Sequence, residues 1–111
     1  MPRMIVWSDA ALDDMAAIKD YLLPISPANA QIVIEALEFR AGTLTTMAGR
    51  GRVIPEFDDK ARRELFVYEW RLMYRLEPET IRIIRVVSGR RPLAFTPGSF
   101  EEAQQEVYAA L

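Results

Sequence analysis

The chain has 111 residues, 50% of them hydrophobic, and a net charge of -2. This length supports one globular core and is too short for two, so we expect a single domain over residues 1–111. The sequence contains no cysteine and no histidine, which excludes disulfides, zinc sites made from these residues, cysteine nucleophiles and catalysis by histidine. No apolar run approaches the length of a membrane span and no secretion signal is visible, so we expect a cytoplasmic protein without metal, cofactor or membrane partner.

Basic residues are concentrated in the second half of the chain. Residues 50–95 hold 11 basic and 7 acidic side chains, although the whole chain is acidic. Only Lys19 and Lys60 are lysines among the 14 basic residues. Arginine is suited to bidentate contacts with carboxylate or phosphate, so this excess favours a local recognition surface. A GC-rich coding bias would produce the same excess.

The first half of the chain predicts one strand and two helices. Residues 3–7 are β-branched and aromatic, which is typical of a strand. Ser8 is a suitable N-cap for a first helix, which Pro24 ends. Ser26 and Pro27 begin a second helix that runs to about residue 49. The short break between the helices predicts an antiparallel helical hairpin.

The second helix is apolar on two sides. One stripe at helical spacing consists of Ala30, Val33, Ile34, Leu37, Ala41 and Leu44 and should face the sheet. A second stripe, on another side of the helix, consists of Ile32, Ala36 and Phe39. Both sides of such a helix need cover. We expect the first helix to cover the second stripe, and a partner protein is the alternative.

The second half of the chain predicts a loop, three strands and a final helix. The loop extends from Gly49 to about Arg62, and the strands lie between Arg63 and Arg91. Residues 99–102 form a capping box, which begins a helix that runs to about residue 110. The order β-α-α-β-β-β-α predicts an α+β fold in which the helical hairpin covers one face of an antiparallel-rich sheet.

The register of the last two strands follows from the turn at residues 77–80. The pattern pairs Leu76 with Ile81, Arg75 with Arg82, Tyr74 with Ile83, Met73 with Ile84, and Arg71 with Val86. One face of this hairpin is then apolar, with Arg85 as its only polar residue. The other face mixes charged and apolar side chains and carries Arg71, Met73, Arg75, Arg82, Ile84 and Val86.

This mixed face has two interpretations. Directly opposed arginines are unfavourable by up to about 1 kcal/mol, so the arginines need an explanation. They are either solvated and paired with Glu64 and Glu69, or they receive an anionic and apolar partner such as an acidic amphipathic peptide or a nucleic-acid backbone. The residues predicted to bind a partner are Arg71, Met73, Arg75, Arg82, Ile84, Arg90 and Arg91, together with Ile32, Ala36 and Phe39.

Nearly the whole chain resembles one family. The motifs are Ser8, Ala11, Asp14-Met15, Ile18 and Tyr21 in the first helix, Gly49-Arg50 and Pro55-Glu56 in the loop, and Arg63-Glu64, WRLMYR from Trp70 and IIRVVSGRR from Ile83 in the strands. In this order they resemble the ParE branch of the RelE/ParE toxin superfamily, the toxins of plasmid-stabilisation (toxin-antitoxin) modules. Two departures are Trp70, where many relatives have tyrosine, and Ser88, where many have histidine.

The resemblance implies a toxin that forms a hetero-oligomer with a cognate ParD-like antitoxin and takes no small-molecule substrate. ParE-type members inhibit DNA gyrase, whereas RelE-type members cut mRNA on the ribosome with lysine and arginine clusters and a late tyrosine or histidine. Here the loop offers only Lys60 as a base, and Phe95 stands near the position of the late tyrosine.

We therefore expect a gyrase inhibitor with no catalytic residues. One alternative is an mRNA endonuclease that clamps phosphate with Arg63, Arg71, Arg75, Arg82 and Arg90. Another is a non-toxic module that binds only its antitoxin.

Overall fold

The computed structural model describes residues 2–89, so the predicted final helix, Arg90 and Arg91 lie outside the described residues. The elements are β1 (Met4–Trp7), α1 (Asp9–Leu22), α2 (Pro27–Thr43), the short 3-10 helix η1 (Ala48–Arg50), β2 (Arg52–Val53), β3 (Arg62–Val67), β4 (Trp70–Leu76) and β5 (Thr80–Ser88). The α+β fold is confirmed. None of the helices among residues 2–89 is long and apolar enough to cross a membrane.

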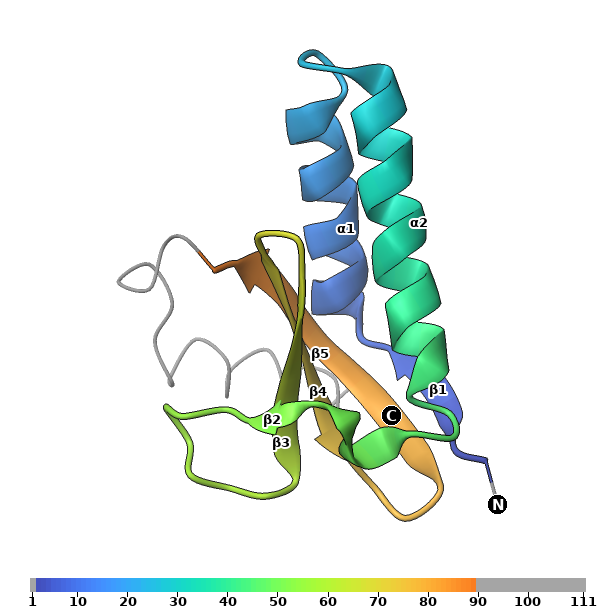
Figure 1. Cartoon of the computed structure of the whole chain (residues 1–111), viewed down its shortest axis with the longest axis vertical. Coiled ribbons are helices and arrows are strands. Elements are labelled where there is room, and N and C mark those ends of the chain that lie inside the picture. Colours follow the sequence, from blue (N-terminus) through green and yellow to red (C-terminus); the bar gives the residue numbers. More distant parts are fainter. Residues whose placement is uncertain (1, 90–111) are drawn as a thin grey trace.

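The two helices form the predicted hairpin. The Ser8 hydroxyl accepts a hydrogen bond from the Ala11 N–H at 2.9 Å, so it caps α1 as expected. Ser26 caps α2 in the same way. Figure 1 shows the helices side by side, with the connection between them projecting beyond the sheet. α2 ends at Thr43 and not near residue 49, and η1 follows as a separate turn.

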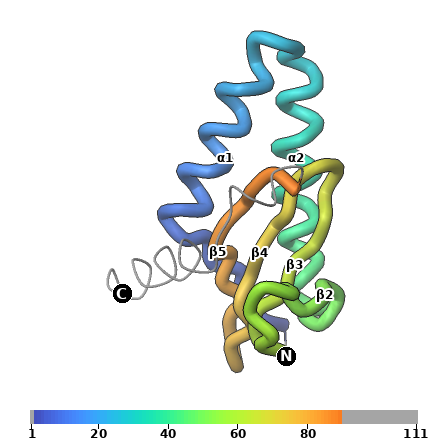
Figure 2. The backbone as a smooth tube through the Cα atoms, turned by 90° about the vertical axis from the view of Figure 1, so that its left-hand side faces the viewer, coloured from blue at the N-terminus to red at the C-terminus, as the bar shows by residue number. Residues whose placement is uncertain are grey.

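The described strands form one sheet in the order β1-β5-β4-β3-β2. β1 pairs in parallel with β5, and the other pairings are antiparallel. The helical hairpin covers one face of this sheet, as the two views in Figures 1 and 2 show. The core between the helices and the sheet is fully buried and includes Leu37, Leu44, Leu72, Tyr74, Ile81 and Ile83.

The β4–β5 register is confirmed near the turn and is wrong farther along. Leu76 pairs with Ile81, Arg75 with Arg82 and Tyr74 with Ile83, as predicted. A β-bulge follows between Met73 and Tyr74, so that Met73 pairs with Arg85 and Arg71 with Val87. The predicted pairs of Met73 with Ile84 and of Arg71 with Val86 are therefore wrong. The bulge also exchanges two valines, because Val86 joins the core under the helices while Val87 lies on the other face.

Contacts from α1 stabilise this bulge. The Ser8 hydroxyl donates to the Ile84 carbonyl at 2.9 Å. The Asp14 carboxylate accepts from the Val86 N–H at 2.8 Å and from the Arg85 guanidinium at 2.7 and 3.0 Å. The expected place of Arg85 on the core face is therefore wrong: the bulge sets Arg85 opposite Met73, and Asp14 on α1 neutralises it.

Candidate functional site

The arginine face is the side of the sheet that lies opposite the helices. It is defined by Arg71, Arg75, Arg82, Glu64, Met73 and Ile84, which β3, β4 and β5 supply. Strand alternation places these side chains on one side, and the short distance between neighbouring strands brings them into contact. The structure thus brings together the arginines and the two apolar residues that the sequence predicted to share a face.

Arg71 lies at the centre of the arginine face and is bound on both sides by carboxylates. Its Nε donates to Glu64 at 2.6 Å, and its two terminal nitrogens donate to Glu56 at 3.0 and 2.9 Å. Only 7% of the Arg71 side chain is exposed. Burial alone would lower the pKa of Arg71, but the hydrogen bonds to Glu56 and Glu64 outweigh it and raise this pKa above its usual value. Arg71 therefore carries a fixed charge that the protein itself neutralises.

Glu64 is a second buried charge in this group of ion pairs. Its side chain is fully buried, and it accepts from Arg52 at 2.7 Å as well as from Arg71. A buried carboxylate needs such charged partners because its desolvation is costly. The interpretation in which the arginines pair with Glu64 is correct for Arg71. Glu56, from the loop between β2 and β3, is an additional partner.

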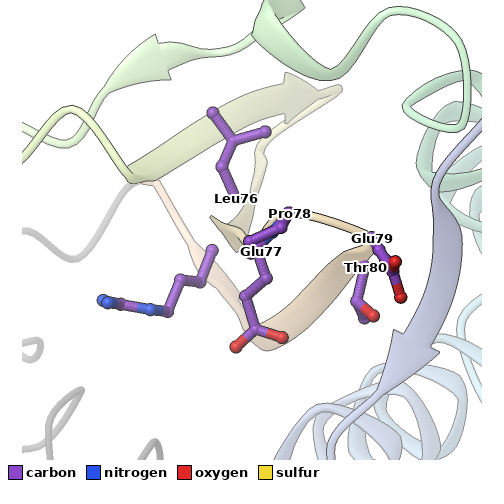
Figure 3. A pocket seen from close by; sticks show the side chains of 6 residues that line it. Leu76, Glu77, Pro78, Glu79 and Thr80 are labelled. Atoms are coloured by element: carbon purple, nitrogen blue, oxygen red, sulfur yellow. The ribbon is translucent and has the colours of Figure 1, made fainter. Parts of the chain in front are cut away.

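Arg75 and Arg82 are directly opposed, as predicted, and each has an acidic neighbour. Arg82 lies 3.3 Å from Glu77, and Arg75 lies 3.9 Å from Asp59. Arg75 and the turn at residues 76–80 line an open depression of about 460 Å³. In Figure 3 the Glu77 and Glu79 carboxylates extend from this turn in different directions. The acidic neighbours explain how the fold tolerates two opposed arginines.

Met73 and Ile84 are not available on an open surface. Both are fully buried, and they form a small second core with Ile54, which is also fully buried. The expectation that these two side chains stand on an open face is wrong, because the loop between β2 and β3 covers them. Ile54 and Phe57 of this loop occupy the position that an apolar partner of Met73 and Ile84 would need.

The outer side of α2 is open. Phe39 is 72% exposed and Ile32 is 51% exposed, whereas Ala36 is partly buried and packs against the main core. The first helix therefore does not cover the second stripe of α2 as expected. Thr43 lies one helical turn beyond Phe39, and its hydroxyl lies 3.5 Å from the guanidinium of Arg50. We call Ile32, Phe39 and Arg50 the α2 surface.

The arginine face offers little to acid-base chemistry. Tyr74 is fully buried, and its hydroxyl accepts from the Gly51 N–H and donates to the Ala48 carbonyl. Burial raises the pKa of this phenol. Lys60 is exposed on the loop. Within residues 2–89, no group of histidine, cysteine or acidic side chains could hold a metal ion.

Sequence reasoning named Glu64 as a partner of the arginines but missed the other acidic residues that neutralise them. Glu56 and Asp59 lie in an irregular loop, where no periodicity assigns a side chain to a face. Asp14 lies on α1, 71 residues before Arg85 along the chain. The available signal was composition, since the net basic segment 50–95 also contains seven acidic residues.

Comparisons with known proteins agree with the fold and the motifs. The sequence model of the family described as "ParE toxin of type II toxin-antitoxin system, parDE" matches residues 5–93. No curated protein sequence matches the chain. A chain from the chromosomal ParDE toxin-antitoxin system of P. aeruginosa is 22% identical and superimposes with a TM-score of 0.64, over 78% of this chain and 95% of that chain.

A second solved structure shares the fold. A chain from the RelBE2 toxin-antitoxin complex of Mycobacterium tuberculosis is 21% identical, with a TM-score of 0.55, over 79% of this chain and 99% of that chain. At these low identities the two likenesses show a common fold. The family match covers most of the sequence, and on that basis the chain belongs to the ParE toxins of type II toxin-antitoxin systems.

Proposed function

We propose that this toxin is neutralised by a cognate antitoxin and that it acts by binding DNA gyrase, with no cleavage of RNA. The observation that supports this proposal is the closed arginine face. Arg71 and Arg82 are paired with carboxylates of the same chain, and Met73 and Ile84 are buried beneath the loop. A surface in this state supplies the fold with internal contacts and leaves few groups for a substrate.

A ribonuclease would need a different surface. Cleavage without a metal requires groups that deprotonate a 2'-hydroxyl, stabilise the phosphorane and protonate the leaving oxygen. An arginine has a pKa above about 12 and is a poor base. A phosphate that approached Arg71 would also have to displace the Glu56 carboxylate from a bidentate pair. These features favour gyrase inhibition over the RelE-type activity that the shared fold also allows.

The α2 surface is the proposed docking site for the antitoxin. Ile32 and Phe39 are both exposed and lie two helical turns apart on the same side of α2, and contiguous exposed apolar side chains mark interaction sites. Six of the ten large exposed apolar residues among residues 2–89 lie on the helical hairpin or its connection: Leu12, Tyr21, Leu23, Ile25, Ile32 and Phe39. Ordering a disordered antitoxin segment costs about 2–5 kcal/mol, so apolar anchors such as Phe39 are needed in addition to charge.

The proposed charge contacts are one arginine beside this surface and one on the arginine face. Arg50 stands near the C-terminal end of α2, and its guanidinium is exposed. Arg75 remains 29% exposed beside the open depression. An acidic antitoxin segment that follows α2 to its C-terminal end would meet Arg50, and it would have to pass around the sheet edge to reach Arg75 on the opposite face. Arg71 and Arg82 would contribute only indirectly, because they fix the loop and the turn.

Expression in bacterial cells tests the mode of action. We expect the wild-type toxin to reduce the negative supercoiling of a reporter plasmid and to stop replication, while primer extension finds transcripts intact. Co-expression of the cognate antitoxin should restore growth. Cut transcripts together with normal supercoiling would establish the RelE-type activity instead. Harmless expression with tight antitoxin binding would identify a module that has lost toxicity.

Binding measurements test the docking site. Phe39→Glu should weaken antitoxin binding at least tenfold, because it places a charge where an apolar anchor is expected, and it should leave the melting temperature nearly unchanged. Met4→Glu is the matched control, since Met4 is 69% exposed but lies on β1. Equal affinities of the two variants would remove the α2 surface from the interface.

A further inference from the structure

The loop that covers the arginine face contacts it through both apolar and acidic side chains. We call residues 54–61, between β2 and β3, the strap. Ile54 is fully buried against Met73 and Ile84, and Phe57 packs against the same small core. Glu56 forms the bidentate pair with Arg71, and the strap thus contributes both apolar and acidic contacts to one face.

The strap has the composition of an acidic amphipathic peptide. Its first six residues, Ile54, Pro55, Glu56, Phe57, Asp58 and Asp59, contain two large apolar side chains and three carboxylates. Asp59 lies 3.5 Å from Arg62 and 3.9 Å from Arg75, so a second carboxylate also meets the arginines. The strap therefore supplies, from within the same chain, the apolar side chains and carboxylates that were expected of a partner for the arginine face.

The backbone of the strap is largely bonded to itself. The N–H groups of Phe57 and Asp58 both donate to the Ile54 carbonyl, and Asp58 adopts a positive φ of 50°. The Ile54 N–H donates to the Arg62 carbonyl and joins the strap to β3. Side chains of Ile54, Glu56 and Phe57 attach the strap to β4 and β5, and at its end the Ala61 carbonyl accepts from the Leu76 N–H of β4 at 2.7 Å. Such a segment can leave the face without breaking the hydrogen bonds between those two strands.

We propose that the strap is an intramolecular ligand of the arginine face, and that an acidic peptide of the pattern Ile-x-Glu from another protein binds this face by displacing it. In the bound state the isoleucine of the peptide would take the place of Ile54 against Met73 and Ile84. Its glutamate would take the place of Glu56 on Arg71. The proposal does not depend on the identity of the toxin target.

Tethering determines how strongly the strap competes. A short tether holds a ligand at a millimolar effective concentration, so a free peptide with the same contacts should barely bind to the wild-type protein. Glu56→Gln removes the charge from the bidentate pair and should weaken the strap. The second contact of Arg71, with Glu64 at 2.6 Å, remains in this variant and keeps the arginine in place.

Methyl NMR tests the proposal at the buried residues themselves. The probe is a synthetic peptide with the sequence of residues 53–60, titrated into full-length protein labelled at the methionine and isoleucine methyl groups. In Glu56→Gln we expect saturable shifts of the Met73 and Ile84 methyls, with at least tenfold tighter binding than in wild type. A peptide with glutamine in place of its glutamate should not bind. Glu79→Gln, at an exposed turn position, should behave like wild type.

Hydrogen exchange provides a second readout. In Glu56→Gln the amides of Ile54, Phe57 and Asp58 should exchange at least tenfold faster, while amides in β4 and β5 stay protected. Faster exchange throughout the sheet would mean that the variant unfolds globally, and the strap would then not be a separable unit. Unchanged strap exchange, absent methyl shifts, or equal binding of the glutamate and glutamine peptides would each overturn the proposal. Gyrase inhibition has a separate readout, plasmid supercoiling, so failure of the strap proposal and failure of the proposed function are distinguishable.

Discussion

Replacing Arg71 with leucine tests whether this arginine stabilises the fold. The side chain is 7% exposed and makes three hydrogen bonds of 3.0 Å or less to Glu64 and Glu56. Its removal leaves Glu64 fully buried with Arg52 as its remaining ion-pair partner, and the Arg52 side chain is 56% exposed. Breaking a buried ion pair costs about 3–5 kcal/mol. Because Arg52 remains, we expect a loss of about 3 kcal/mol in the free energy of unfolding.

This loss of unfolding free energy can be converted into an expected change in melting temperature. The entropy of unfolding is about 2.1 cal/mol/K per residue, which gives about 0.23 kcal/mol/K for 111 residues. A loss of 3 kcal/mol should therefore lower the melting temperature by about 13 °C. Urea unfolding followed by circular dichroism measures the free energy directly, because the midpoint shifts while the slope stays constant.

A control and a double variant complete this test. Arg75→Leu removes a partly exposed arginine with one ion-pair contact at 3.9 Å, so it should cost less than about 1 kcal/mol. Replacing both Arg71 and Glu64 with leucine should restore much of the lost stability, because apolar residues can substitute for a complete buried pair. An Arg71→Leu protein as stable as wild type would refute this reasoning and would free Arg71 for a partner.

Three further changes test other contacts. The hydrogen bond from Arg71 lowers the pKa of Glu56 below its ordinary value of 4.5. The stability that this carboxylate contributes is therefore present above about pH 4.5 and is lost as the pH falls through the lowered pKa. The difference between the urea midpoints of wild type and Glu56→Gln should accordingly disappear in acid. Gly51→Ala should cost about 1–3 kcal/mol in chemical unfolding, because the added Cβ would lie 2.5 Å from a tyrosine hydroxyl and 2.7 Å from a backbone carbonyl, whereas Gly49→Ala, with open space around it, should be nearly neutral. Asp14→Ala should cost about 2–4 kcal/mol by calorimetry, because it leaves the bulge amide of Val86 without its acceptor; an unchanged enthalpy and melting temperature would contradict that role.

Local patterns predicted the parts of the fold that depend on local interactions. Ser8 and Ser26 could be identified as helix starts because an N-cap is a local contact. Each side-chain oxygen accepts a hydrogen bond from the N–H three residues later. The pairing of Leu76 with Ile81 follows from a short turn, which fixes the register beside it. Both features are properties of short segments, and the structure confirms them.

Tertiary contacts determine what the sequence could not show. The bulge in β5 depends on Asp14 and Ser8, which come from a distant helix, and a single extra residue moves Val86 to the core face. The strap covers the arginine face through Ile54 and Glu56. Because its backbone is irregular, no periodicity in the sequence assigns these side chains to a face. The arginine face was predicted to be open because only the β4–β5 hairpin was considered, without the strap that covers it.

A purified gyrase assay tests the central claim of this account most directly. The toxin is titrated into gyrase, relaxed plasmid and ATP, with and without the cognate antitoxin, and the same preparation is added to translating ribosomes. We predict dose-dependent loss of supercoiling that the antitoxin reverses, with the ribosome-bound mRNA intact. Full supercoiling at saturating toxin, together with mRNA cut on the ribosome, would contradict the account.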